Sequence, residues 1–86
     1  MARLLVFSTE DCVACDVVKP IVKREAQRAK MLLEEHDPVE EPALAQRFDI
    51  QVVPTLVLLN NDEFIGELHG MFNEKDVRRL MSCATA

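Results

Sequence analysis

The strongest constraint on the fold of this chain is a change of hydrophobic period at Cys12. Before it, the apolar run from Arg3 to Ser8 has the length and the Val and Phe content of a buried strand. From Cys12 to Ala29 the pattern follows one helical stripe instead, made of Cys15, Val18, Val22, Ala26 and Ala29. Pro20 lies inside this helix, where it removes a backbone hydrogen bond and is expected to introduce a kink. A buried strand that leads directly into an amphipathic helix predicts an α/β fold.

The middle of the chain predicts a second strand and a short second helix. Lys30 to Glu34 is expected to form the strand, and a right-handed crossover would place it parallel to the first. A turn-rich connection from Asp37 to Pro42 follows. Pro42 suits the first position of a helix, with Leu44 and Phe48 four residues apart on its inner side.

The last third of the chain predicts a hairpin and a final helix. Thr55–Leu59 and Phe64–Leu68 are apolar runs, and the Asn and Asp residues between them tolerate the left-handed backbone of tight turns. Asn73 can cap the last helix, with Asp76 three residues later in an approximate capping box. The inner face of that helix is expected to hold Val77, Leu80 and Met81. The predicted order is β-α-β-α-β-β-α, a four-stranded mixed sheet flanked by helices.

Length and composition limit the class of protein. Eighty-six residues suit a single domain, 1–86, and 49% hydrophobic with 29% charged residues is the balance of a soluble globular monomer. No apolar stretch approaches the roughly 20 residues of a membrane-spanning helix. The net charge of −5 disfavours nucleic acid as a partner. Met1 to Phe7 is too short for a signal peptide, so we expect a cytoplasmic protein, where stable structural disulfides are rare.

The chemistry of the chain is expected at Cys12 and Cys15, a Cys-x-x-Cys motif that follows a strand and opens a helix. Helix N-termini stabilise thiolates, which makes Cys12 the exposed nucleophile and Cys15 the thiol that resolves the mixed disulfide. Half of a zinc site is the alternative, and it needs about four ligands. His36, His69 and Cys83 lack any paired spacing, so no metal is expected.

A second signal is Pro54, which stands directly before the apolar run Thr55–Leu59. Proline cannot donate to a strand ladder, so this position is unusual in a core sheet. X-Pro bonds are where cis peptides occur, although a trans proline at the start of a strand is more common. The residues alone leave both isomers open.

Together these segments resemble the thioredoxin family. Cys12–Pro20 matches the family's Cys-x-x-Cys helix, with its proline five residues after the second cysteine, and Phe48–Leu56 resembles the segment that enters its cis-proline loop. Pro54–Gly70 matches its strand, turn, strand and glycine, and the match continues through Asn73 and Val77. The match begins only at the family's central strand, without the extra N-terminal strand and helix of full-length thioredoxins, which indicates a short, glutaredoxin-sized redoxin.

The resemblance implies a thioredoxin fold and a set of substrate-binding residues around the cysteines. A cis bond would precede Pro54 and face the pair, and the backbone of Val53 would pair with an extended substrate segment. The other positions that the family's substrate site would include here are Asp11, Val13, Ala14 and Gly70.

The sequence departs from the family at several of these positions. Asp11 stands where thioredoxins have a tryptophan, Val13-Ala14 replaces Gly-Pro, and Val6 replaces a buried aspartate that accepts a proton. Glutaredoxins carry a Gly-Gly turn before the last helix, whereas here Met71 follows Gly70. These differences favour a protein disulfide over glutathione as substrate.

The sequence therefore predicts a thiol–disulfide oxidoreductase that donates electrons to protein disulfides without a bound cofactor. A reductase or glutathione would recycle it, and ribonucleotide reductase, which small redoxins supply with electrons, is one candidate target. Two alternatives stay open: a glutaredoxin-like protein recycled by glutathione, and a redox-inert or metal-binding interaction module.

The remaining notable side chains have simpler interpretations. Cys83 is expected to be a small apolar contact or an inert thiol near the C-terminus. Met31, Met71 and Met81 are expected to fill the core, and Phe72 is expected to be exposed beside Gly70.

Overall fold

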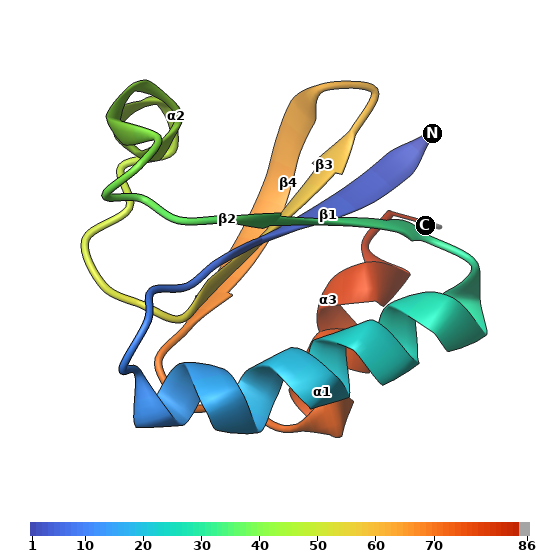
Figure 1. Cartoon of the computed structure of the whole chain (residues 1–86). Coiled ribbons are helices and arrows are strands. Elements are labelled where there is room, and N and C mark those ends of the chain that lie inside the picture. The colour runs from blue at the N-terminus through green and yellow to red at the C-terminus, as the bar shows by residue number, and fades with distance from the viewer. Residues whose placement is uncertain (85–86) are drawn as a thin grey trace.

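The computed structural model describes residues 1–84 and contains the predicted order of elements (Figure 1). The four strands and three helices are β1 (Ala2–Phe7), α1 (Val13–Ala29), β2 (Leu32–His36), α2 (Pro42–Arg47), β3 (Thr55–Asn60), β4 (Glu63–His69) and α3 (Glu74–Ser82). None of these helices is both long and apolar enough to cross a membrane.

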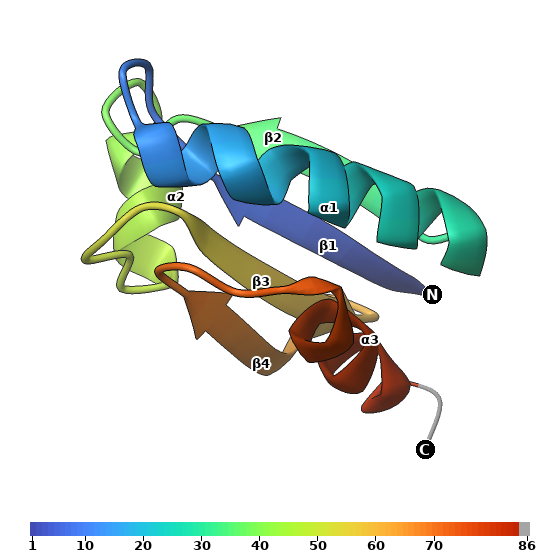
Figure 2. The same ribbon diagram turned by 90° about the horizontal axis from the view of Figure 1, so that it is seen from below.

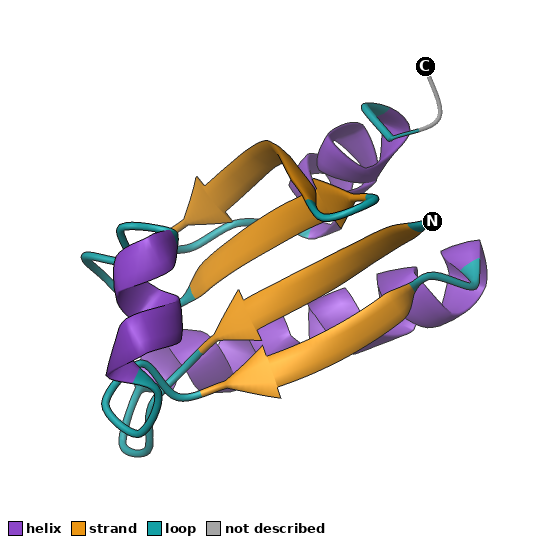
Figure 3. Cartoon of the chain, turned by 90° about the horizontal axis from the view of Figure 1, so that it is seen from above, coloured by secondary structure: helices purple, strands orange, loops and turns teal. Residues whose placement is uncertain are grey.

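The strands form one mixed sheet in the order β2-β1-β3-β4. β1 is parallel to β2 and antiparallel to β3, and β4 is antiparallel to β3. Helices α1 and α3 cover one face of the sheet, while α2 crosses one end of the other face (Figures 1 and 3). The molecule is thus a three-layer α/β/α arrangement around a four-stranded sheet.

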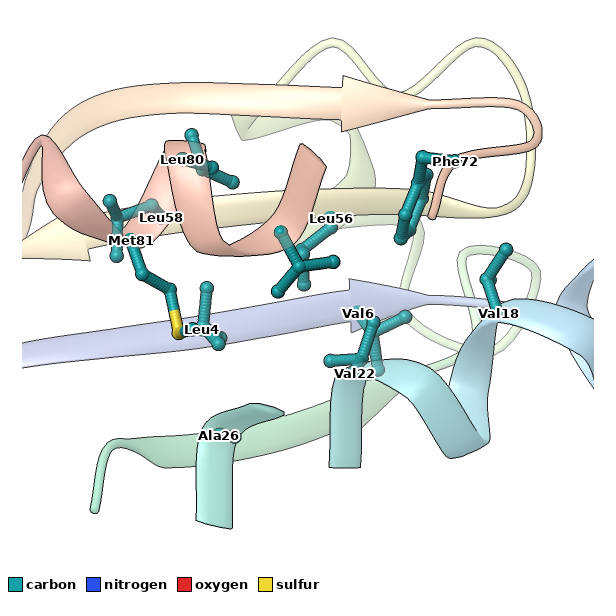
Figure 4. Close-up of a cluster of buried hydrophobic side chains, with 11 residues drawn as sticks. Leu4, Val6, Val18, Val22, Ala26, Leu56, Leu58, Phe72, Leu80 and Met81 are labelled. Atoms are coloured by element: carbon teal, nitrogen blue, oxygen red, sulfur yellow. The ribbon is translucent and has the colours of Figure 1, made fainter. Parts of the chain in front are cut away.

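The larger core lies between the sheet and the pair α1 and α3 (Figure 4). Alternation along β1 turns Leu4 and Val6 toward these helices, where the stripe of α1 meets them through Val18 and Val22. Helix α3 can approach β4 closely because Gly66 has no side chain: a Cβ there would lie 3.0 Å from Leu80 Cδ1.

The smaller core lies on the opposite face of the sheet, under α2. Leu5 and Phe7 of β1 point to this side and are buried. Leu44 and Phe48 pack against them, as the predicted inner side of α2 requires, and Pro42 occupies the first turn of that helix. The two faces of β1 are therefore both buried, which explains why its sequence is a continuous apolar run.

The stripe predicted for α1 is wrong at its last position. Ala29 is exposed, and the buried residue near that end is Glu25, whose side chain is only 2% exposed. Both of its oxygens are bonded to Arg78 of α3, from Nε at 2.8 Å and from a terminal nitrogen at 3.2 Å. This hydrogen bonding lowers the pKa of Glu25 below its ordinary value of 4.5, against the opposing effect of burial.

The second strand begins later than predicted. α1 ends at Lys30, whose left-handed backbone (φ 55°) turns its N–H back to the carbonyls of Ala26 and Gln27. Met31 also bonds to the Ala26 carbonyl, at 2.9 Å, so the strand starts only at Leu32. The helix-ending turn thus occupies the two residues assigned to the strand from its apolar pattern.

The predictions for Met71 and Phe72 are also wrong, since Phe72 is buried in the larger core and Met71 is exposed. The predicted capping box of Asn73 with Asp76 is present, and Val77 occupies the fourth helical position. An apolar residue just before a cap packs against that fourth position, and Phe72 and Val77 lie in the same core cluster. The cap therefore explains which of the two side chains turns inward.

Candidate active site

The amino-terminal end of α1 is built around a cysteine that caps the helix. Cys12 is the N-cap residue, and its Sγ accepts a hydrogen bond from the Cys15 N–H at 3.1 Å. Asp11 directly before it adopts a left-handed backbone with φ of 57°, a conformation that aspartate tolerates better than most residues. The turn after β1 therefore delivers the sulfur of Cys12 to unpaired N–H groups of the first helical turn.

Cys12 and Cys15 are joined by a disulfide, with their Cα atoms 5.2 Å apart. Cys12 is partly exposed, whereas Cys15 faces the core and is 1% exposed. An incoming reagent therefore reaches Cys12 more easily than Cys15. The hydrogen bond that Cys12 Sγ accepts from the Cys15 N–H would also stabilise a thiolate on that sulfur after reduction.

The bond between Val53 and Pro54 is cis, as the resemblance implied. Pro54 is buried, and its carbonyl accepts a hydrogen bond from the Gly70 N–H at 3.0 Å. Gly70 has a φ of 77°, which few residues other than glycine adopt readily. The Thr55 hydroxyl donates to the Val52 carbonyl at 2.7 Å, a hydrogen bond that spans the Val53–Pro54 bond.

The sheet brings this loop to the same end of the molecule as the cysteines. Phe7 at the end of β1 pairs with Thr55 at the start of β3, and Thr55 pairs with His69 at the end of β4. The loops next to these three paired residues carry Cys12, Pro54 and Gly70, and they gather at one end of the sheet (Figures 1 and 2). Predicted site residues from three distant parts of the sequence therefore share one end of the fold.

An apolar rim is exposed on the segments that carry these residues. It consists of Val13 (80% exposed), Val17, Val52 and Met71, which lie respectively between the cysteines, one turn later, before the cis bond and after Gly70. Of these four, the sequence singled out only Val13 for the site; Ala14 beside it is half-buried. Val17 could have been found from its place one helical turn after Val13 and outside the buried stripe.

Charged groups near the cysteines are mostly acidic. Glu10, Asp11 and Asp16 are exposed and flank the pair. Nearby His36 contacts Phe7 and bonds to Glu34 at 2.9 Å and Glu41 at 2.7 Å. Burial lowers the pKa of His36, but these two carboxylates outweigh burial, and the pKa lies above its ordinary value of 6.5.

The third cysteine and the histidines do not join the pair. Cys83 is an exposed free thiol at the end of α3, and its Sγ donates a hydrogen bond to the Arg79 carbonyl at 3.7 Å. His69 is exposed at the end of β4. Within residues 1–84, no three His, Cys, Asp or Glu side chains are grouped so that they could hold a metal ion.

Comparison with known proteins identifies the family. Residues 2–83 match the family model described as Thioredoxin. The chain belongs to the thioredoxin family. No curated protein sequence matches it.

Solved structures of thioredoxins share the fold. A single-site mutant of a thioredoxin from Halobacterium salinarum NRC-1 superposes with a TM-score of 0.90 at 28% identity, over 99% of this chain and 75% of that one. Thioredoxin 1 from Thermosipho africanus TCF52B gives 0.84 at 20% identity, over 93% and 90% of the two chains. The germline-specific thioredoxin Deadhead from Drosophila melanogaster gives 0.83 at 22%, over 94% and 78%.

Family membership and the joined cysteine pair support the general activity of a thiol–disulfide oxidoreductase. Within that frame this thioredoxin-family chain has its own features. Val6 is buried in the larger core, at the position where the sequence comparison placed an acidic residue in thioredoxins.

Proposed function

We propose that the protein is a dithiol electron donor that reduces disulfides in other proteins. The observation that carries the proposal is the asymmetry of the pair: Cys12 is partly exposed and caps a helix, while Cys15, in the first turn of that helix, is buried. This arrangement suits one sulfur to attack an external disulfide and the other to act only afterwards.

The reaction proceeds by two exchanges. In the reduced protein, the Cys12 thiolate attacks one sulfur of the target disulfide, which forms a Cys12–target bond and releases the other target sulfur as a thiolate. The Cys15 thiol loses its proton to solvent and attacks Cys12, which forms the Cys12–Cys15 bond and releases the second target thiolate. Two electrons pass to the target, and the donor ends as the disulfide.

The loop before Pro54 supports docking of an extended target segment. Val53 is half-buried, and neither its N–H nor its carbonyl has a hydrogen-bond partner within residues 1–84. A target strand can satisfy both groups in the manner of an added β-strand. The exposed apolar rim, with Met71 63% exposed, offers contacts to the target's side chains.

A reductase or glutathione must return two electrons to the Cys12–Cys15 disulfide after each turnover. The target in this proposal is a disulfide-containing protein, and ribonucleotide reductase, which small redoxins supply with electrons, is one candidate.

Replacing the buried cysteine tests the proposal. Cys15→Ser should leave Cys12 able to attack but unable to be released, so a peptide disulfide should accumulate as a mixed disulfide at Cys12. Turnover should fall to the uncatalysed rate, as measured by mass spectrometry and thiol release. Cys83→Ser is the matched control and should keep full turnover. Trapping at Cys83, or no reversible loss of two thiols in the unmodified protein, would favour the inert-module alternative.

A further inference from the structure

A polar cavity of about 450 Å³ opens beside the cysteine pair. It lies between the loop that follows β1, the first turns of α1, and the segment that joins β2 to α2. Figures 2 and 3 show these loops meeting at one corner of the molecule. Glu10 and Asp16, which line the cavity, stand just before and just after the two cysteines. An occupant of this cavity would therefore lie next to a substrate disulfide bound at Cys12.

The cavity carries negative charge that the described chain does not neutralise. Its two basic side chains are already engaged, Lys19 with Glu35 at 3.1 Å and His36 with Glu34 and Glu41. Four further lining carboxylates have no ion-pair partner within residues 1–84: Glu10, Asp16, Asp37 and Glu40. Of these, Asp37 already accepts a hydrogen bond from the Val39 N–H at 2.8 Å. Their charge is available to an external cation.

A buried hydroxyl also opens into the cavity. Ser8 is only 8% exposed, and its hydroxyl has no hydrogen-bond partner within the described residues. Alternation from Val6 places the Ser8 side chain on the α1 face of the sheet, the face on which Lys19 and Glu35 line the cavity. Arg3 Nε is the only fully enclosed side-chain polar atom without a partner in residues 1–84, so the Ser8 oxygen is open to solvent where the residue lines the cavity. A donor that enters the cavity can therefore bond to this hydroxyl.

We propose that these four residues, Ser8, Glu10, Asp16 and Glu40, form an acidic cleft that binds an arginine or lysine side chain of the target protein. The cleft selects disulfides that have a basic residue within a few positions. A guanidinium suits it well, because its five N–H donors can bond to the hydroxyl and to carboxylates together. This proposal rests on the proposed reduction of protein disulfides and specifies which of them are preferred.

Two disulfide peptides of equal length test the cleft, one with Arg and one with Glu at the same positions beside the disulfide. The rate constant for oxidation of the reduced protein by each peptide is measured by stopped flow. We expect the Arg peptide to react about 1.5- to 5-fold faster for each ion pair formed. The preference should shrink from about 0.01 M to about 1 M salt, because the Debye length falls from about 30 Å to about 3 Å.

Three variants locate the effect. Glu40→Gln should reduce the ratio of the two rates. Glu63→Gln makes the same charge change at the start of β4, the end far from the cysteine loops, and should preserve the ratio. Ser8→Ala alters no charge and should slow the Arg peptide selectively, with thermal unfolding as a check on its fold. Equal rates for the two peptides with the unmodified protein would overturn the cleft. An equal loss in Glu40→Gln and Glu63→Gln would overturn it too. Failure to reduce either peptide would instead contradict the proposed function.

Discussion

Carboxylates lie in two different environments along helix α1. At its amino-terminal end, Glu10 and Asp16 are exposed near Cys12 and have no ion-pair partner in residues 1–84. Further along the same helix, Glu25 is buried and is bonded through both oxygens to Arg78. A buried carboxylate must be paired, because an unpaired charge is costly to remove from water. Glu25 therefore links α1 to α3, whereas the charges of Glu10 and Asp16 are free to act on a substrate that approaches the cysteines.

The largest effect on stability is expected from Arg78→Ala. It removes both hydrogen bonds to the buried Glu25 carboxylate and leaves it only the longer ion pair with Arg28, at 3.6 Å. The midpoint of thermal unfolding should fall clearly, while the rate of peptide reduction per folded molecule should stay unchanged.

The matched control is Arg24→Ala. It breaks the exposed ion pair between Arg24 and Glu74, which also joins α1 to α3. An exposed pair contributes only about 0–1 kcal/mol, so its loss should be smaller. If the two variants lose the same stability, burial of Glu25 does not distinguish the two ends of α1.

A smaller effect is expected on the acid side of the stability profile. The folded pKa of Glu25 lies below 4.5, because hydrogen bonding to Arg78 outweighs burial. The unfolded chain therefore binds a proton first as pH falls, and the stability from Glu25 is present above pH 4.5 and is lost through the folded pKa. Glu25→Gln should flatten this loss in denaturant titrations at about pH 2–5, and Glu63→Gln should not.

The smallest effect is expected at the other end of the helix. The helix dipole favours a Cys12 thiolate, and the exposed carboxylates oppose it on a similar scale. We therefore expect a reducing potential, nearer to roughly −270 mV than to −120 mV. Glu10→Gln and Asp16→Asn should each stabilise the thiolate and raise the potential by about 5–20 mV, measured against a glutathione series. A more negative potential in either variant would show that these charges do not act on Cys12.

Local patterns in the sequence were sufficient to predict the order of the elements and the cysteine pair, although not the start of β2 or the last buried position of α1. The apolar run of β1, the stripe of α1 and the Asn73 cap depend on neighbours a few residues away. The cis bond before Pro54 came from resemblance, since the residues alone left both isomers open.

What the sequence did not reveal depends on distant partners. Glu25 resembles a solvated helix residue until Arg78, separated from it by 53 positions, is placed beside it. The hydroxyl of Ser8 opens into a cavity only because three segments meet there. Phe72 is the exception, because its burial follows from the cap that comes directly after it.

The hairpin between β3 and β4 has a practical consequence for handling the molecule. Its turn, where Asn61 and Asp62 adopt left-handed backbones, lies at the far end of β3 from Thr55 and the redox loops. A dye, a bead linker or an inserted affinity peptide at that turn would point away from docking partners. Such a labelled protein could be immobilised on a sensor surface with its reactive cysteine facing the flow.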